Sequence, residues 1–346
     1  MAWRAPVALS KTFPTVQDVA RAANVSTATV SRALSLPDRV SEETRRIVME
    51  AVERTGYSIN RAARNLRRQE TNSIVVLVPN LGNPFFSRIL AGIEARLARD
   101  GYNVLVKDTN NPDVPRERVL DYVHVNRADG IICLDGTLPE HFFRHGASVP
   151  PVVFCCEWID GGIGPSIRFD NSGGQAAAVT HLFEHGHRDI GHVLGPKGNV
   201  LTGERVEGFT QGLRRHGLRE RADWIFEGDF SLGSGVEAAR RWLAMADRPT
   251  AIATSSDIMA CGFISELHRA GVEVPRDVSV VGFDDIDIAE VFIPALTTIR
   301  QPRRHIGESA ADTLLGLVRA DNAGSGKEQV VRWPAELVPR ESVRRI

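Results

Sequence analysis

The feature that most constrains the fold is an alternation, across residues 73–320, between short apolar runs and stretches whose apolar residues recur at helical spacing. Strands joined in this way by helices form right-handed βαβ units, which build parallel sheets covered on both faces. About ten such strands are too many for one small sheet, and the pattern breaks near residues 170–174, so two lobes are predicted. The candidate strands span residues 73–79, 102–108, 130–135, 151–157, 189–195, 251–255 and 277–282.

Composition excludes several classes of protein. The chain has 346 residues, of which 42% are hydrophobic and 25% are charged, and no apolar run approaches the roughly 18 residues that span a membrane. The N-terminal segment lacks the apolar core of a signal peptide, so a cytoplasmic protein with no membrane partner is expected. The four cysteines have no paired metal-binding spacing, which favours buried, reduced thiols.

Polar and aromatic residues that follow the strands are candidates for a binding site. In open parallel sheets, ligands bind beyond the carboxyl ends of the strands, which here face the space between the lobes. Phe85 and Phe86 follow the first strand and are placed to stack against a ring. Arg205, near a helix start, is suited to bind hydroxyl groups or a carboxylate, and Asp284, after an apolar strand, is suited to accept from vicinal hydroxyls. The alternatives are core aromatics for the phenylalanines and surface charges for the other two residues.

Residues 15–56 predict three short helices. Thr15 with Asp18 matches a capping box, Ser26 caps a second helix over residues 27–34, and a third helix runs from Ser41 to a stop at Gly56. This is the pattern of a helix-turn-helix domain. The second helix has a polar outer face of short side chains and one arginine, which is suited to reading base edges in the major groove. A three-helix packing or dimerisation module is the alternative.

A basic segment, residues 60–69, follows this head. It contains four arginines and one large apolar residue, Leu66, and residues 1–72 carry 12 Lys or Arg against 7 Asp or Glu. So short a helix is marginal in water, and we expect it to order when phosphates neutralise the arginines. Leu66 would then wedge between base steps in the minor groove. A solvated interdomain helix is the alternative.

Several motifs stand in the same order as in the lactose/galactose-repressor (LacI/GalR) family, which the chain resembles over residues 15–342. They are Thr15-Val16-Gln17-Asp18-Val19-Ala20, Val25-Ser26-Thr27-Ala28-Thr29-Val30-Ser31-Arg32-Ala33-Leu34, Asn83-Pro84-Phe85-Phe86, Gly186-His187-Arg188-Asp189-Ile190, Arg205-Val206-Glu207-Gly208-Phe209, Gly282-Phe283-Asp284-Asp285 and Pro294-Ala295-Leu296-Thr297-Thr298-Ile299-Arg300-Gln301-Pro302. Within the family the chain most resembles the cytidine-responsive repressors, in part through Glu157. One departure is Ile59, which stands where many members have proline.

The resemblance implies an all-α helix-turn-helix head and an α/β body of the periplasmic-binding-protein type, with parallel sheets. The predicted parts are the head at 14–58, a hinge helix and linker at 59–71, and an effector-binding and dimerisation domain at 72–342. Lobe 1 would comprise about 72–170 and 302–330, and lobe 2 about 171–301 and 331–342. The chain would cross between lobes near Asp170, Gln301 and Val331.

The resemblance also implies which residues contact ligands. Those predicted to contact DNA are Thr15, Ser26, Thr27, Ala28, Thr29, Ser31, Arg32, Asn60, Arg61, Ala63, Arg64 and Leu66. Those predicted to contact the effector are Asn83, Phe85, Phe86, Glu157, Arg205, Phe230, Ser256 and Asp284. Sugar-binding relatives often have asparagine at the position of Ser256 and Asp-Arg at that of Cys156-Glu157, which argues against a simple hexose or pentose.

The sequence thus predicts a homodimeric transcription regulator, a repressor, that binds palindromic operator DNA under the control of a nucleoside or sugar-like effector. No cofactor and no metal are expected, because no carboxylate or cysteine completes a ligand set with His181, His185 and His187. No enzyme motif is found. Two alternatives remain, a binding or transport protein without a DNA role and an α/β enzyme acting on nucleosides or sugars.

Overall fold

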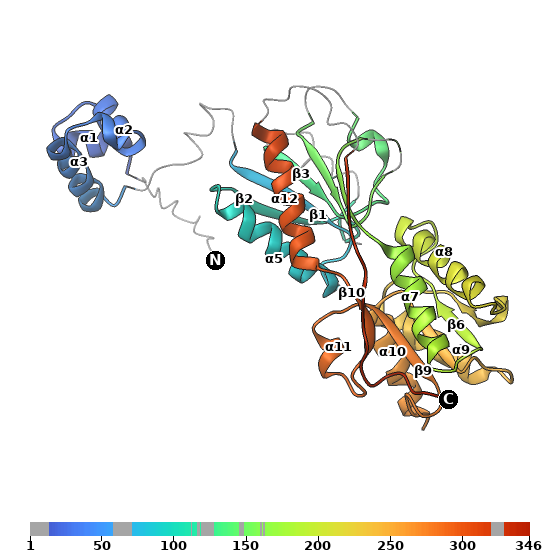
Figure 1. Ribbon diagram of the computed structural model, residues 1–346. Coiled ribbons are helices and arrows are strands. Elements are labelled where there is room, and N and C mark those ends of the chain that lie inside the picture. The colour runs from blue at the N-terminus through green and yellow to red at the C-terminus, as the bar shows by residue number, and fades with distance from the viewer. Residues whose placement is uncertain are drawn as a thin grey trace, which may run out of the picture. The chain divides into compact units, whose positions relative to one another are not determined.

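The computed structural model describes residues 14–57, 71–111, 113–115, 118, 128–144, 149–159, 161, 163–319 and 329–346. The chain divides into two compact units, Met1–Gln69 and Glu70–Ile346 (Figure 1). The predicted joint residues Asn60, Arg61, Ala63, Arg64 and Leu66 lie outside the described residues.

The N-terminal unit contains the three predicted helices. They are α1 (Val16–Ala23), α2 (Thr27–Ser35) and α3 (Glu42–Thr55). Ser26 Oγ accepts a hydrogen bond from the backbone N–H of Thr29 at 3.1 Å, and Gly56 ends α3 in the left-handed conformation that glycine adopts without strain. Buried Val19, Val30 and small neighbours form the core between the helices, so the amphipathic pattern sets the fold of this unit.

Two six-stranded sheets form the second unit, one in each lobe. The lobe 1 sheet has the order β11-β5-β4-β3-β1-β2, and the lobe 2 sheet has the order β12-β10-β9-β8-β6-β7. Lobe 1 holds β1 (Ser73–Val78), β2 (Asn103–Asp108), β3 (Gly130–Cys133), β4 (Val152–Cys155), β5 (Ser166–Phe169) and β11 (Val330–Trp333). Lobe 2 holds β6 (Ile190–Val193), β7 (Ile225–Phe226), β8 (Ala251–Thr254), β9 (Ser279–Asp284), β10 (Thr297–Arg300) and β12 (Glu336–Val338).

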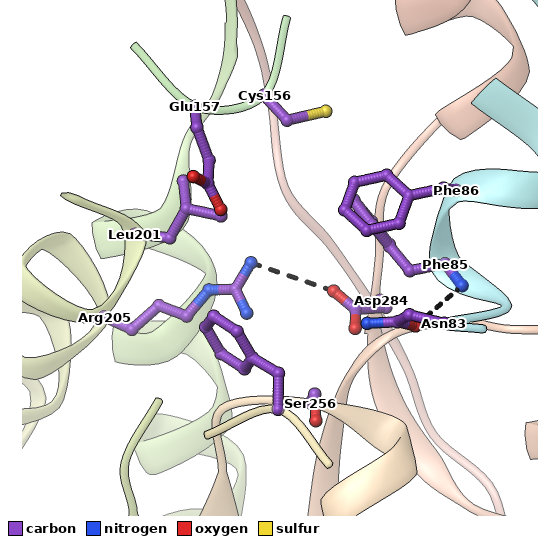
Figure 2. Close-up of a pocket in the computed structure, with 10 residues that line it drawn as sticks. Asn83, Phe85, Phe86, Cys156, Glu157, Leu201, Arg205, Ser256 and Asp284 are labelled. Atoms are coloured by element: carbon purple, nitrogen blue, oxygen red, sulfur yellow. Dashed lines mark hydrogen bonds and ion pairs between the residues drawn. The ribbon is translucent and has the colours of Figure 1, made fainter. Parts of the chain in front are cut away.

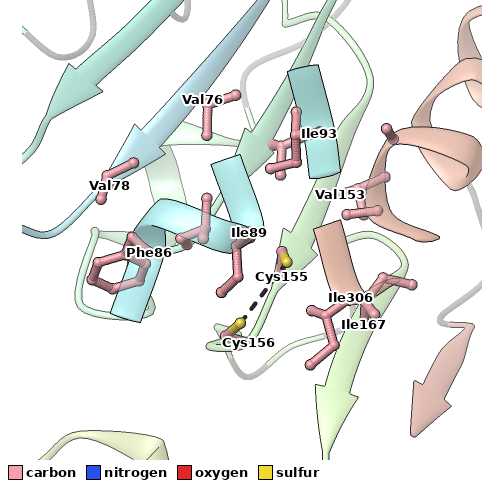
Figure 3. Packing of buried hydrophobic residues seen from close by; sticks show 14 of the residues in the cluster. Val76, Val78, Phe86, Ile89, Ile93, Val153, Cys155, Cys156, Ile167 and Ile306 are labelled. Carbon is pink, nitrogen blue, oxygen red and sulfur yellow. Dashed lines mark hydrogen bonds between the residues drawn. The ribbon is translucent and has the colours of Figure 1, made fainter. Parts of the chain in front are cut away.

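Helices pack in pairs on the sheets. In lobe 1, α5 (Phe85–Ala98) lies beside α12 (Arg303–Arg319) over one face of the sheet (Figure 1). Figure 3 shows Ile89 and Ile93 of α5 beside Val76 of β1 and Ile306 of α12 in the core of this lobe. In lobe 2, one face carries α7 (Asn171–Glu184) and α8 (Val200–Arg215), and the other carries α9 (Leu232–Ala244) and α10 (Asp257–Arg269).

The predicted α/β architecture is confirmed, with three differences. The expectation omitted β5, β7, β10, β11 and β12, which have only two to four residues each and so carry little periodicity. Strand β12 pairs antiparallel with β10, so the lobe 2 sheet is not wholly parallel. The third crossing, predicted near Val331, lies between Trp333 and Glu336, because β11 stays in parallel register with β5 up to the pair Trp333 and Phe169 and β12 pairs with β10.

Among the described helices, none is both long and apolar enough to cross a membrane.

Candidate functional site

A pocket lies between the two lobes and is lined by ten residues. All eight residues predicted to contact an effector line it, and Cys156 and Leu201 complete it. Lobe 1 contributes the side chains around the start of α5 and the end of β4, and lobe 2 contributes those of α8, α10 and β9 (Figure 2). The pocket has a volume of about 30 Å³ and adjoins an outer cleft of about 720 Å³. The topology therefore brings together residues that are up to 201 positions apart in the sequence, Asn83 and Asp284.

The polar centre of the pocket is a buried ion pair. Arg205 Nη2 lies 3.7 Å from Asp284 Oδ1, and the two residues are only 2% and 5% exposed (Figure 2). Arg205 also donates from Nε to Asn171 Oδ1 at 3.0 Å, and its guanidinium lies 3.9 Å from the ring centre of Phe283. Both residues are therefore interior charges, which overturns the alternative of surface charges.

Asp284 is held in an unusual state at the end of β9. Its φ angle of 119° lies in a region that non-glycine residues rarely adopt. Gln301 donates to Asp284 Oδ1 at 2.8 Å, and burial raises the pKa of the carboxyl to about 6 against the opposing effect of Arg205. Strain of this kind is common where a ligand must be met at a fixed angle.

Aromatic side chains from both lobes form the apolar wall. Phe85 and Phe86 begin α5 with ring centres 5.1 Å apart in an edge-to-face arrangement, and Asn83 Oδ1 accepts from the N–H of Phe85 at 3.0 Å. Both rings also belong to the lobe 1 core, so the two phenylalanines are core aromatics and pocket residues at the same time. Phe230 faces them from lobe 2 with a φ angle of 64°.

Glu157 lies at the boundary between the pocket and the outer cleft. Its Oε2 accepts from the N–H of Gly136 at 2.8 Å and its Oε1 from Asn199 Nδ2 at 2.9 Å. Burial raises the pKa of Glu157 to about 7. Ser256 is the N-cap of α10, and its Oγ accepts from the N–H of Met259 at 3.2 Å, so this hydroxyl has a structural task at the pocket wall.

Sequence reasoning missed three residues of this site. Leu201 lies one helical turn before Arg205 on α8, and that spacing was a usable signal. Gln301 follows β10 directly, and a position just after the carboxyl end of a strand is itself a signal for a ligand-side residue. Cys156 has a φ angle of 68° just after β4, and no sequence signal indicates that conformation.

The outer face of α2 presents the predicted DNA-contacting residues. Thr27, Ala28, Ser31 and Arg32 are exposed, whereas the buried Val30 of the same helix points into the core. Several of the predicted residues are hydrogen-bonded within the head, and Arg32 Nε donates to the carbonyl oxygen of Ala28 at 3.3 Å. Thr15 donates to Asp18, and Ser26 and Thr29 hydrogen-bond to each other at 2.8 Å across the first turn of α2.

The histidines considered for metal binding have other partners. His187 Nδ1 hydrogen-bonds with Thr250 Oγ1 at 2.9 Å and its Nε2 with Ser279 Oγ at 2.9 Å, and burial lowers its pKa to about 4. No group of three potential metal ligands occurs among the described residues.

Comparison with known proteins extends over nearly the whole chain. Residues 15–60 match the model of the "Bacterial regulatory proteins, lacI family", and residues 179–343 match that of the "Periplasmic binding protein-like domain". The HTH-type transcriptional repressor CytR of Escherichia coli (strain K12) is 38% identical over 96% of this chain and 97% of its own length. The repressor PurR of Photobacterium profundum is 34% identical over 95% of this chain and 98% of its own.

Solved structures show the same similarity as the sequence comparisons. The lac repressor dimer bound to operator and the anti-inducer ONPF matches with a TM-score of 0.84 and 31% identity, over 96% of this chain and 100% of that chain.

A helix-turn-helix head and a two-lobed body with a pocket between the lobes define a DNA-binding transcription regulator. The extent and level of identity then determine the family. The chain belongs to the lacI family and is a DNA-binding transcriptional repressor. The relatives named above are transcriptional repressors, so the alternative of an α/β enzyme loses its support. The helix-turn-helix head argues against the alternative of a binding or transport protein without a DNA role.

Proposed function

We propose that a small effector, nucleoside or sugar-like, binds between the lobes across the pocket and the adjoining outer cleft, and controls the affinity of this repressor for operator DNA. The observation that carries the proposal is the buried pair of Arg205 and Asp284 beside the aromatic wall. Burying an ion pair in a small cavity is costly, and pairs of this kind are frequent where a polar ligand is recognised.

The lining chemistry favours a ligand that has both a flat ring and hydroxyl groups. Phe86 and Phe230 offer faces for stacking, and Asp284 offers carboxylate oxygens to hydroxyl donors. Glu157 and Asn83 line both the pocket and the outer cleft, so a ligand longer than a single ring would contact them. A nucleoside has all of these groups, whereas a simple hexose lacks the flat ring.

We further propose that two copies of the chain bind one palindromic operator in the nucleoid. Thr27, Ala28 and Arg32 of each copy would read the major groove, and Leu66 the central minor-groove step. The solved lac repressor dimer on operator supports this arrangement by similarity. Effector binding favours one arrangement of the lobes, and by thermodynamic linkage operator DNA changes effector affinity by the same factor.

The experiment is calorimetric titration of the full chain with cytidine, uridine, adenosine, guanosine, ribose and galactose, followed by operator binding with each probe present. The operator is first selected from a random duplex library. We expect one nucleoside to bind and to change operator affinity. Asp284→Asn should weaken that binding at least about tenfold, because a hydrogen bond to a charged group is lost.

The control is Asp223→Asn, whose side chain is 80% exposed and lies outside the pocket. It should bind the nucleoside like the wild type. The pocket assignment is wrong if Asp284→Asn also binds like the wild type, and effector control by this class is wrong if no probe alters operator affinity.

A further inference from the structure

The turn that carries Asp284 continues into lobe 1. The turn of residues 284–287 begins at Asp284, the last residue of β9 in lobe 2, yet Ile286 is only 2% exposed and packs in the lobe 1 core with Phe85 and Phe86. One end of this four-residue turn therefore lines the pocket, and the rest is docked on the other lobe.

The turn is strained, and polar contacts hold it. Asp284 and Asp285 have φ angles of 119° and 52°, in a region that side chains disfavour. Asp285 accepts from Arg300 Nε and from Arg340 Nη2, each at 2.7 Å. A strained backbone persists only while its surroundings impose it, so the conformation of the turn depends on these partners.

Arg303, at the start of α12, joins the turn to the pocket wall of lobe 1. Its Nη2 donates to the carbonyl oxygen of Asp285 at 2.9 Å and to Asp287 Oδ1 at 3.0 Å. Its Nη1 lies 3.4 Å from the carbonyl oxygen of Pro84 and 3.5 Å from that of Phe85, which begins α5. The Arg303 side chain is 4% exposed, so its contacts with the backbone carbonyl oxygens are largely shielded from water, whereas the side chain of Asp287 is 62% exposed.

We infer that Arg303 is a positioning residue that couples effector binding to the arrangement of the lobes. The inference rests on the proposed function. An effector that hydrogen-bonds to Asp284 changes the balance of its contacts with Arg205 and Gln301, and so changes the strained turn. Arg303 then transmits the change to the start of α5, because it contacts both segments through one planar guanidinium.

A second arginine provides a matched control. Arg88 on α5 donates to the same oxygen, Asp287 Oδ1, at 2.7 Å, but both side chains of this ion pair are about 60% exposed. Exposed pairs contribute little to stability. Arg88 holds the turn through this side-chain contact, whereas Arg303 also binds its backbone, so loss of Arg88 should leave coupling intact.

The experiment uses the full chain and compares wild type, Arg303→Met, Arg303→Lys and Arg88→Met. The probe is the nucleoside of the tested panel that changes wild-type operator affinity most, and the readout is the ratio of operator affinities without and with it at saturation. We expect the ratio to fall at least about fivefold in Arg303→Met, within the usual range of coupling. In Arg303→Lys, which keeps the charge but lacks the planar guanidinium, the ratio should fall less. In Arg88→Met the ratio should equal that of the wild type.

The outcomes separate coupling from a merely structural role. A structural role lowers the melting temperature and leaves the ratio unchanged, and that result with the probe still bound overturns the inference. Should Arg303→Met not fold, Arg303→Lys and Arg303→Gln are measured in the same way, and unchanged ratios in both have the same meaning. A wild-type ratio of one for every probe overturns the proposed function itself.

Discussion

At the scale of single residues, burial decides the chemistry of the pocket. Glu157, Arg205 and Asp284 are ordinary charged residues in the sequence, but the lobes remove them from water. Burial raises the pKa of both carboxyls and lowers that of the Arg205 guanidinium. The consequence is a site whose charge depends on pH within the physiological range.

Glu157 allows a test of this point. Its pKa is raised from 4.5 to about 7, so its protonated form favours the folded state. The resulting stabilisation is present below pH 4.5 and is lost as the pH rises through about 7, a change of about 3 kcal/mol. We therefore expect Glu157→Gln to gain stability relative to the wild type between pH 5 and pH 8, measured by urea unfolding.

Glu237→Gln is the control, because the Glu237 side chain is 75% exposed. Its stability difference from the wild type should not vary with pH. If the stability difference between Glu157→Gln and the wild type is also independent of pH, the pKa of Glu157 is not raised in the folded protein.

At the scale of elements, glycines set how closely the helix pairs approach. On α8, a methyl group at Gly208 would overlap with the carbonyl oxygen of Ser172 on α7. The same relation joins Gly307 of α12 to Ile89 of α5, and Gly235 of α9 to Met259 of α10. These three helix pairs thus pack backbone against backbone, and this rigid packing supports the pocket residues at their ends.

Two glycines on α8 test this packing. Gly208→Ala should lower the free energy of unfolding by about 1–3 kcal/mol, because the helices must separate. Gly203→Ala should raise it by about 0.5–1 kcal/mol, because nothing lies within 4 Å of a methyl group there and alanine favours the helix. Thermal unfolding of the two variants checks both signs, and equal effects would contradict the packing argument.

At the scale of the whole molecule, the contributions of charged and of apolar residues to operator affinity should be separable by their dependence on salt. We expect operator affinity to fall linearly with salt on logarithmic axes, with a slope of about −0.9 for each phosphate neutralised. Arg64→Ala should reduce the slope by about one unit, whereas Leu66→Ala should weaken binding and reduce the DNA bend without changing the slope.

Anisotropy titrations at several salt concentrations and a bending assay measure these effects. Arg46→Ala is a control, because Arg46 is already paired with Glu43 and Glu50 on α3. If Leu66→Ala binds the operator with full affinity and bends it as the wild type does, Leu66 does not wedge between base steps. If the slope is unchanged in Arg64→Ala, this arginine does not contact phosphate.

The sequence alone determined the three helices of the head, seven of the twelve described strands and the class of protein. Caps at Ser26 and Ser41, the stop at Gly56 and the apolar run of β1 are local signals, and each appears in the structure at its predicted place. Strand β9 begins and ends two residues later than predicted, so Asp284 is its last residue. Motif order predicted the residues that line the pocket, since a family pattern records positions that are distant in the sequence.

Only the tertiary structure decided how these residues meet. The pairing of Arg205 with Asp284, the docking of Ile286 in the opposite lobe and the contacts of Arg303 each join segments from different strands and helices. The pKa of Glu157 follows from the same assembly. Burial and strain are properties of the whole packed body, because they depend on atoms that the local sequence does not contain. The sequence thus determined a repressor with a two-lobed body, and the packing of its lobes decided which groups in the pocket between them are charged, strained and linked.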